Sequence, residues 1–149
     1  MLHIFIDADA CPVKQEVYRV AKRCGLQVTL VANAWMRIPA GDWLRLEVVG
    51  NDLDAADDWI VDRVETEDIV ITADIPLAAE VIEKQAQALS PRGELFTPDN
   101  IRERLNMRDF MDTMRSSGLT SGGPPPLSAT DRQAFANGLD TYLARYTAT

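Results

Sequence analysis

Residues 3–14 read HIFIDADACPVK, and this stretch decides the fold class. A short apolar run typical of a buried strand leads directly to Asp7 and Asp9, and a Cys-Pro pair follows. Pro12 suits the first turn of a helix, because its φ is already helical and no N–H is needed there. The stretch therefore predicts a strand, a turn and a helix, with two carboxylates at the junction.

Strand-like and helix-like segments alternate along the rest of the chain. We expect strands at residues 3–9, 26–33, 44–50, 68–74 and 93–97, and helices at residues 12–25, 54–64, 76–89 and 98–117. Such alternation implies right-handed crossovers and a mainly parallel sheet with helices on both faces. The sequence thus predicts a three-layer α/β fold.

The C-terminal part begins with a segment rich in Gly, Pro and Ser at residues 116–130. We expect this loop to be an ordered tether for a last amphipathic helix at residues 131–146, in which Phe135, Leu139 and Leu143 recur at helical spacing. With 149 residues, of which 46% are hydrophobic, the chain can bury a sizeable core. We therefore expect residues 1–149 to form one domain.

The composition excludes several classes of protein. We find no secretory signal, because acids appear by the seventh residue, and no apolar run of the roughly 20 residues that a membrane span needs. Cys11 and Cys24 fit no zinc-binding pattern and are expected to be free thiols. We expect a cytoplasmic protein that does not associate with membranes.

The net charge of −8 is concentrated in the middle of the chain. Residues 51–100 hold thirteen acidic and three basic residues, whereas the segments on either side each hold six basic and five acidic ones. A solvated helix surface is one explanation. A divalent-cation site with a polyanionic substrate is the other, since it needs acids flanked by arginines.

Two predicted strands deliver acids to the same edge of the sheet. Asp7 lies at the end of the first strand and Asp74 ends the fourth, and ligands bind outside the carboxyl ends of strands in open parallel sheets. Asp54, Asp57 and Asp58 lie in the first turn of the helix between them. Helix capping is the alternative role for Asp9, Asp54 and Asp74, while Asp7 has little structural reason to be there.

Clustered carboxylates repel one another unless a cation joins them, and Mg²⁺ or Mn²⁺ prefers such oxygen ligands. The chemistry typical of these clusters is phosphoryl transfer, in which the metal activates a water. No basic side chain is then needed to supply the nucleophile. The one histidine, His3, lies at the other end of the first strand and is expected to be a packed residue.

The motifs ADD at residues 56–58 and TAD at residues 72–74, with Asp7 on the first strand, resemble the PIN-like nuclease superfamily, including its flap and 5′-nuclease branch. Over nearly the whole chain the sequence is similar to the uncharacterised bacterial YaiI/YqxD family. The motifs that carry this likeness are DADACPVK, DAADDWI, ITADIPLAAE, RG, LNMRDF and SGGPPPLS. The resemblance implies a PIN-like domain, and the activity comes from the wider superfamily.

The resemblance to the superfamily implies a catalytic and metal-binding site. It makes metal ligands of Asp7, Asp57, Asp58 and Asp74, and gives Thr72 a hydroxyl that orients the site. Many flap-type nucleases carry another acid where this chain has Pro76, which puts a second metal ion and catalysis in doubt. Asp9 and Asp54 are the acids available to substitute.

These observations predict a Mg²⁺- or Mn²⁺-dependent nuclease that hydrolyses phosphodiester bonds in RNA or structured nucleic acid. Lys14, Arg102 and Arg108 are the candidate phosphate contacts, although arginines on helices are ordinarily solvated. The sequence leaves the choice between monomer and homodimer open.

Two alternatives compete with a nuclease. The first is a PIN-like module that binds nucleic acid or protein without cleavage. The second is a phosphatase of the haloacid dehalogenase class, which also begins with Asp-x-Asp after the first strand. That class needs a lysine ahead of a later Asp pair, whereas here Asp57 and Asp58 precede Lys84.

Overall fold

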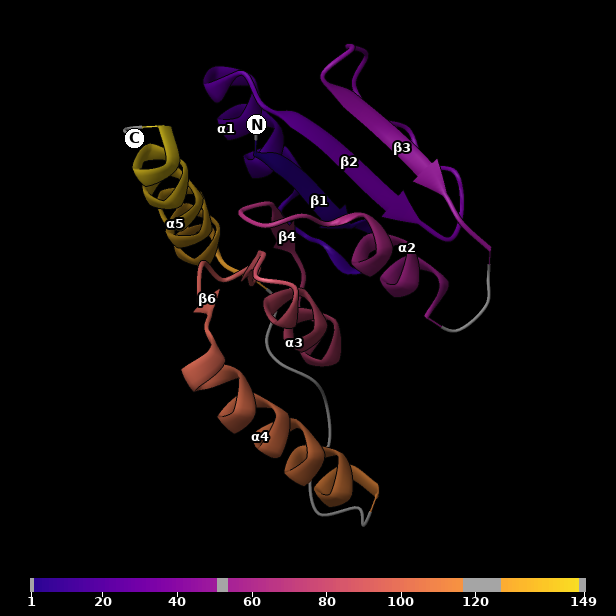
Figure 1. The fold of residues 1–149 in the computed structure, drawn as a ribbon, viewed down its shortest axis with the longest axis vertical. Helices are drawn as coiled ribbons and strands as arrows, with labels where there is room; N and C mark the ends of the chain where they lie inside the picture. The colour runs from indigo at the N-terminus through magenta and orange to yellow at the C-terminus, as the bar shows by residue number, and fades with distance from the viewer. Residues whose placement is uncertain (1, 51–53, 117–126, 148–149) are drawn as a thin grey trace.

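A six-stranded sheet forms the centre of the computed structural model, which describes residues 2–50, 54–116 and 127–147 (Figure 1). Its strands, in chain order, are β1 His3–Asp7, β2 Gln27–Ala32, β3 Leu44–Val48, β4 Ile69–Ile71, β5 Gln87–Leu89 and β6 Leu95–Phe96. Their order across the sheet is β3-β2-β1-β4-β5-β6. Neighbouring strands are parallel except β5 and β6, which are antiparallel.

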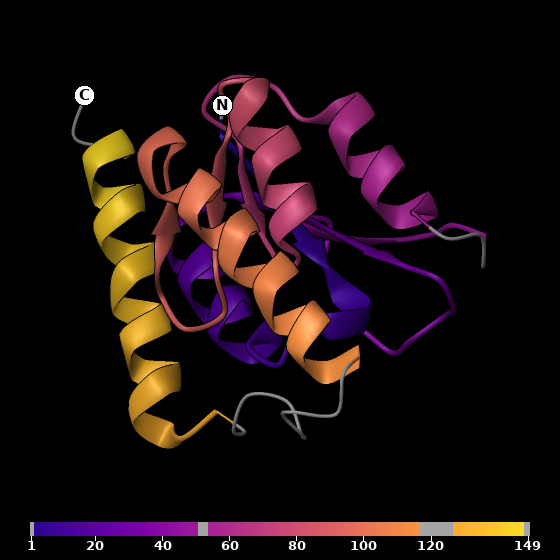
Figure 2. The same cartoon turned by 90° about the horizontal axis from the view of Figure 1, so that it is seen from below.

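Helices cover both faces of this sheet. They are α1 Lys14–Cys24, α2 Ala55–Arg63, α3 Ile75–Glu83, α4 Pro98–Ser116 and α5 Ala129–Thr147, with a 3₁₀ turn at Ala8–Ala10. Side chains of α1 and α5 pack on one face, and those of α2, α3 and the start of α4 pack on the other. Figure 2 shows α4 running alongside α3. The predicted three-layer α/β fold is confirmed.

Within the described ranges, no helix has both the length and the apolar character needed to cross a membrane.

Strand β1 shows why the opening stretch folds as predicted. Ile4 and Ile6 are fully buried against α1 and α5, and Phe5 is buried against α2 and α3. A central parallel strand covered on both faces must be apolar on both sides, which explains the continuous IFI run. Asp7 ends the strand because its side chain leaves this core at the edge of the sheet.

The C-terminal helix α5 closes the face formed by α1. Gly93, with φ of +87°, lies so close to it that a Cβ atom there would come within 2.6 Å of the Ala134 carbonyl oxygen. An ion pair of 3.1 Å between Arg92 and Asp131 joins the same two segments. The helix predicted at residues 131–146 is confirmed, whereas most of the loop predicted as a tether, residues 117–126, lies outside the described residues.

The predicted helix at residues 76–89 is wrong at its C-terminal end. Helix α3 stops at Glu83, Gln85 adopts a left-handed conformation with φ of 67°, and β5 then pairs with β4. Alanine, glutamine and leucine favour helix locally, so the propensity of this segment gave no sign of a strand. Pairing with β4 overrides that propensity, because it buries Ala88 and Leu89 within the sheet.

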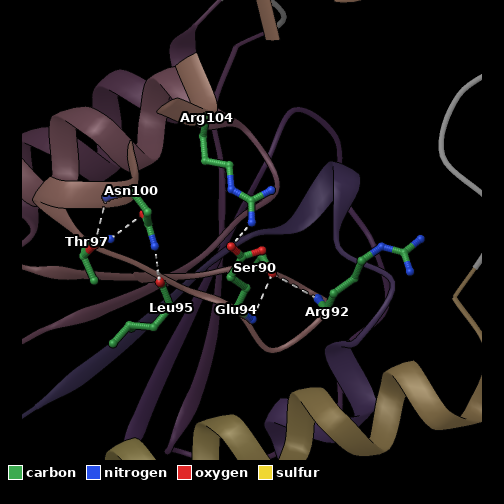
Figure 3. Close-up of polar contacts among 7 residues, drawn as sticks. All are labelled: Ser90, Arg92, Glu94, Leu95, Thr97, Asn100 and Arg104. Atoms are coloured by element: carbon green, nitrogen blue, oxygen red, sulfur yellow. Dashed lines mark hydrogen bonds and ion pairs between the residues drawn. The ribbon is translucent and has the colours of Figure 1, made fainter. Parts of the chain in front are cut away.

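A polar turn sets the start of α4. Thr97 and Asn100 each accept a hydrogen bond from the other's backbone N–H, at 3.1 and 2.8 Å, and the Asn100 side chain donates to the Leu95 carbonyl (Figure 3). Nearby, the Ser90 hydroxyl accepts from the backbone of Arg92 and Glu94, and Glu94 pairs with Arg104 of α4. These contacts attach α4 to the turn between β5 and β6.

Candidate active site

The carboxylate of Asp7 lies at the point where the sheet reverses direction. The chain moves from β1 outward to β2 and β3, then returns to the other side of β1 to build β4 and β5. Such a reversal opens a crevice at the carboxyl ends of the two central strands, because the connections there leave in opposite directions. Asp7 ends β1 at this crevice and is half-buried.

Thr72 follows β4 on the opposite side of the crevice and holds Asp7 in place. Its side chain is buried, and its hydroxyl donates to Oδ2 of Asp7 at 3.0 Å. The same hydroxyl oxygen accepts the backbone N–H of Asp74 at 3.0 Å. Because the hydroxyl is used as donor and as acceptor, it fixes the two acids relative to each other.

Asp74 has two roles in the structure. It is the N-cap of α3, where its Oδ1 accepts the backbone N–H of Leu77 at 3.1 Å, and Pro76 occupies the first turn. The capping alternative raised by the sequence is therefore confirmed. Its charge also acts on the other acids, because it raises the pKa of both Asp7 and Asp57. A capping role and a place in the acidic cluster are compatible.

Asp57, in the first turn of α2, has a strongly raised pKa. Burial raises its pKa to about 7, and the charges of Asp74, Asp7, Asp54 and Glu80 act in the same direction. Acids from β1, α2 and α3 therefore lie near enough to one another at this edge for their charges to interact. Sequence reasoning missed Glu80, which is exposed on α3 and belongs to the ITADIPLAAE motif.

The pKa of Asp7 is also raised, first by burial and then by the charges of Asp74 and Asp9. The hydrogen bond from Thr72 and the charge of Lys14 act against this shift. Lys14 thus lies near enough to Asp7 to stabilise its ionised form, while its ammonium group donates to the Cys11 carbonyl at 2.8 Å. A cation at the crevice would favour the ionised carboxylate in the same way.

The structure places the other predicted ligands less centrally. Asp9 is exposed, and its Oδ2 accepts the backbone N–H of Asn33 at 2.8 Å, so it ties the turn after β1 to the end of β2. Asp54 occupies the N-cap position of α2 with φ of 70°, but its side chain makes no capping hydrogen bond. Asp58 is exposed on α2 beside Asp57.

Carboxylate oxygens are the ligands that a hard divalent cation prefers, but these side chains have an open arrangement that does not form a metal site. Among the residues that the structure describes, no group of three or more His, Cys, Asp or Glu side chains is arranged so that it could hold a metal ion. Mutual repulsion between carboxylates favours such separation. Metal binding would therefore require these side chains to turn toward one another.

Of the two predicted phosphate contacts on α4, Arg102 is the one whose side chain lies within the described part of the chain. Arg102 is exposed, and the side chain of Arg108 lies outside what the structure describes. A hollow of about 280 Å³ does lie along α4, where it is lined by Glu94, Asn100, Glu103, Arg104 and Met107. None of these is a predicted site residue.

His3 and Cys11 are packed residues, as expected. The His3 ring contacts the Thr29 hydroxyl at 2.7 Å and lies 4.6 Å from the Phe5 ring, and burial lowers its pKa. Burial raises the pKa of the Cys11 thiol to about 11, so this cysteine is a thiol rather than a reactive thiolate at neutral pH.

Comparison with known proteins identifies the family. A family model described as "Uncharacterized BCR, YaiI/YqxD family" matches residues 5–145. The chain belongs to the YaiI/YqxD family. It is 58% identical over 147 residues to a "UPF0178 protein" of Hydrogenovibrio crunogenus, covering 97% of each chain. A second UPF0178 protein, from Idiomarina loihiensis, is 59% identical over 143 residues, covering 95% of this chain and 97% of the relative. No solved structure gave a significant match.

We predict that the Thr72 hydroxyl sets the ionisation of Asp7 in this YaiI/YqxD protein. Thr72→Val removes the donor, so the pKa of Asp7 should rise further, whereas Thr72→Ser should leave it near the wild-type value. The Val variant should also lose about 1–3 kcal/mol of unfolding free energy, because polar groups are left unsatisfied. Carboxyl ¹³C NMR titration in EDTA measures the first effect, and urea unfolding measures the second. Equal Asp7 pKa values in both variants would show that the hydroxyl is not positioned as described.

A second prediction concerns pH and the metal-free protein. The pKa of Asp57 is about 7 in the folded state against an ordinary 3.8, so the folded state holds the proton more tightly than the unfolded chain. The resulting stabilisation is complete below the ordinary value and is lost as the pH rises through 7. Melting temperatures in EDTA should therefore fall more steeply for wild type than for Asp57→Asn across this range. Asp62→Asn, on the exposed part of the same helix, is the matched control. Parallel pH profiles for wild type and Asp57→Asn would contradict the assignment.

Proposed function

We propose that this protein is a divalent-metal-dependent nuclease that hydrolyses phosphodiester bonds in RNA or structured nucleic acid, with Mg²⁺ or Mn²⁺ as cofactor. The observation that carries the proposal is the convergence of Asp7, Asp57 and Asp74 at the reversal point of the sheet. A structural role accounts for Asp74 alone, as an N-cap. Among the hydrogen bonds of the described residues, none gives Asp7 or Asp57 a capping role, and both are less easily ionised there than in water.

The residues of the chain have distinct parts in this proposal. Thr72 orients Asp7 and fixes its distance from the backbone of Asp74. Asp57 exchanges its proton near neutral pH, so a cation can replace that proton at little cost. Lys14, whose charge acts on Asp7, contacts a phosphate of the substrate in this proposal. When bound, a divalent ion would polarise the phosphate and lower the pKa of a water.

Hydrolysis of labelled nucleic acids tests this proposal. Single-stranded RNA, single-stranded DNA and hairpins of each are incubated with Mg²⁺, Mn²⁺ or EDTA, and the products are separated on denaturing gels. We expect cleavage with at least one of the two metals and none with EDTA. Cleavage that persists in EDTA, or its absence under every condition, would reject a metal-dependent nuclease.

Two observations favour a second candidate, a module that binds nucleic acid or protein without cutting. The described residues hold no group of three metal-binding side chains in position, and Pro76 stands where many flap-type nucleases have another acid. Binding that is indifferent to EDTA, without cleavage, would support this candidate. The phosphatase alternative is not supported, because Lys84 lies at the C-terminal end of α3 and Asp74 lies at its start. For the nuclease, we propose nucleic acid as the partner, and for either candidate we propose the cytoplasm as the location.

A further inference from the structure

The connection between β2 and β3 is unusual for a parallel pair. Parallel neighbours need a long crossover, which is a helix in most proteins, yet residues 33–43 cross over without any helix or strand. Residues that bind ligands are disproportionately found on loops that a rigid scaffold holds in position. The loop begins where β2 ends, so it leaves the sheet at the same edge as Asp7.

Side chains at residues 35–38 of this loop alternate between exposed and packed. Met36 and Ile38 are partly buried against the core cluster of α1 and α5. Trp35 is 75% exposed, and Arg37, two residues further on, is also exposed. Because the packed residues Met36 and Ile38 alternate with them, the indole and the guanidinium both lie on the solvent side of this stretch. The packing of Met36 and Ile38 fixes the loop, while Trp35 contributes little to the core.

The base of the loop is tied directly to the acidic edge. The Asn33 N–H donates to Asp9, whose charge in turn raises the pKa of Asp7. Val31 is the register partner of Asp7 in the sheet. Trp35 follows Val31 by four positions along the chain, a length that extended chain spans in at most about 14 Å. The backbone of Trp35 therefore lies within the length of a few nucleotides from the backbone of Asp7.

We propose that Trp35 is a stacking platform for an unpaired base and that Arg37 contacts the adjoining phosphate, so that the protein engages single-stranded nucleic acid. A base offers a flat face of the size of an indole, and every base has one. A duplex hides these faces within its stack, so the platform selects unpaired strands. The charge of Arg37 suits a phosphate, and a strand stacked here would extend toward the acids. The inference deepens the proposed nuclease function and rests on it for its biological meaning.

Binding assays test the platform apart from cleavage. Fluorescence anisotropy of a labelled twelve-nucleotide strand is measured with EDTA and with Mg²⁺, for RNA, for DNA and for a duplex of each. Gels run on the same samples show whether the strands stay intact. Trp35→Ala should weaken single-strand binding about tenfold or more, whereas Trp35→Phe, which keeps a ring, should retain most of it. Arg37→Ala should lower the slope of log affinity against log salt concentration by about one, because one phosphate contact is lost. Met107→Ala removes an apolar side chain of similar exposure on α4 and should change nothing.

Each outcome decides the inference. Equal single-strand affinity for wild type and Trp35→Ala would overturn it, as would no measurable binding by wild type in either condition. A Trp35→Ala variant that alters only the oligomeric state, at unchanged affinity, would assign the loop to contact with a second copy and would also overturn it. Hydrolysis of a small methyl nitrophenyl phosphodiester, which has no base to stack, tests the metal chemistry separately. A failure of the nuclease proposal and a failure of the platform are therefore distinguishable.

Discussion

Asp7→Asn should abolish metal-dependent phosphodiester hydrolysis while the protein remains folded. Losing a residue that only supports a metal ligand typically costs about 10–100-fold in affinity or activity, so losing a ligand itself should cost more than about a hundredfold. The fold should persist because Asn keeps an oxygen that can accept from Thr72, and because burial disfavours the charge of Asp7. Initial rates with Mn²⁺ on the preferred strand, with circular dichroism on the same samples, measure both effects.

His3→Ala is the control for this experiment. His3 starts the strand that Asp7 ends, and it makes packing and hydrogen-bond contacts without reaching the acids. The variant should be less stable and cleave at nearly the wild-type rate. A large loss of rate with stability intact would point to histidine chemistry instead. Wild-type activity in Asp7→Asn would reject the nuclease proposal for this site.

Mn²⁺ should stabilise the wild-type protein strongly and the Asp74→Asn variant much less. Binding to the folded state alone adds about 2.7 kcal/mol once the free ion reaches 100 times its dissociation constant. For a chain of this size, that free energy raises the melting temperature by about 5–11 °C. Thermal melts of both proteins with EDTA and with millimolar Mn²⁺ measure the difference.

The same melts separate the two roles of Asp74. In EDTA, Asp74→Asn should be more stable than wild type, because a charge that opposes ionisation of Asp7 and Asp57 is removed while Asn can still cap α3. The weaker interaction with the helix dipole opposes this by about 0.3–1 kcal/mol. Asp74→Ala is the matched control, since it loses the charge and the cap together and should be less stable than Asp74→Asn. A destabilised Asp74→Asn, with no Mn²⁺ response in either protein, would leave Asp74 as a structural cap alone.

Much of the fold could be predicted from sequence because local pattern and tertiary environment agree. The IFI run and the Pro12 turn indicate a buried strand followed by a helix, and both are present. Strand β5 could not be predicted, because its residues favour helix. They form a strand only because they pair with β4 in the folded protein. The polar turn of Thr97 and Asn100 also agrees with the predicted start of the helix at residue 98.

Part of the candidate site could be predicted from sequence, because the strand pattern alone determines where several of its residues lie. Asp7, Thr72 and Asp74 follow strands, so parallel topology alone brings them to one edge. Glu80 lies within a helix, where sequence does not say which way a side chain faces across the sheet. Trp35 is one of three tryptophans, and only packing distinguishes it from Trp43 and Trp59, which are partly buried.

Anomalous diffraction from a crystal of the wild-type protein soaked in Mn²⁺ tests the central claim most directly, because it locates the ion without knowledge of the substrate. We predict an anomalous peak at the carboxyl edge of the sheet, within bonding distance of Asp7 and of at least one of Asp57 and Asp74. The side chains should have turned toward one another from the open arrangement described above. A soaked crystal with no peak at this edge, at an Mn²⁺ concentration that supports cleavage, or with a peak bound only by residues elsewhere, would contradict the assignment of the active site.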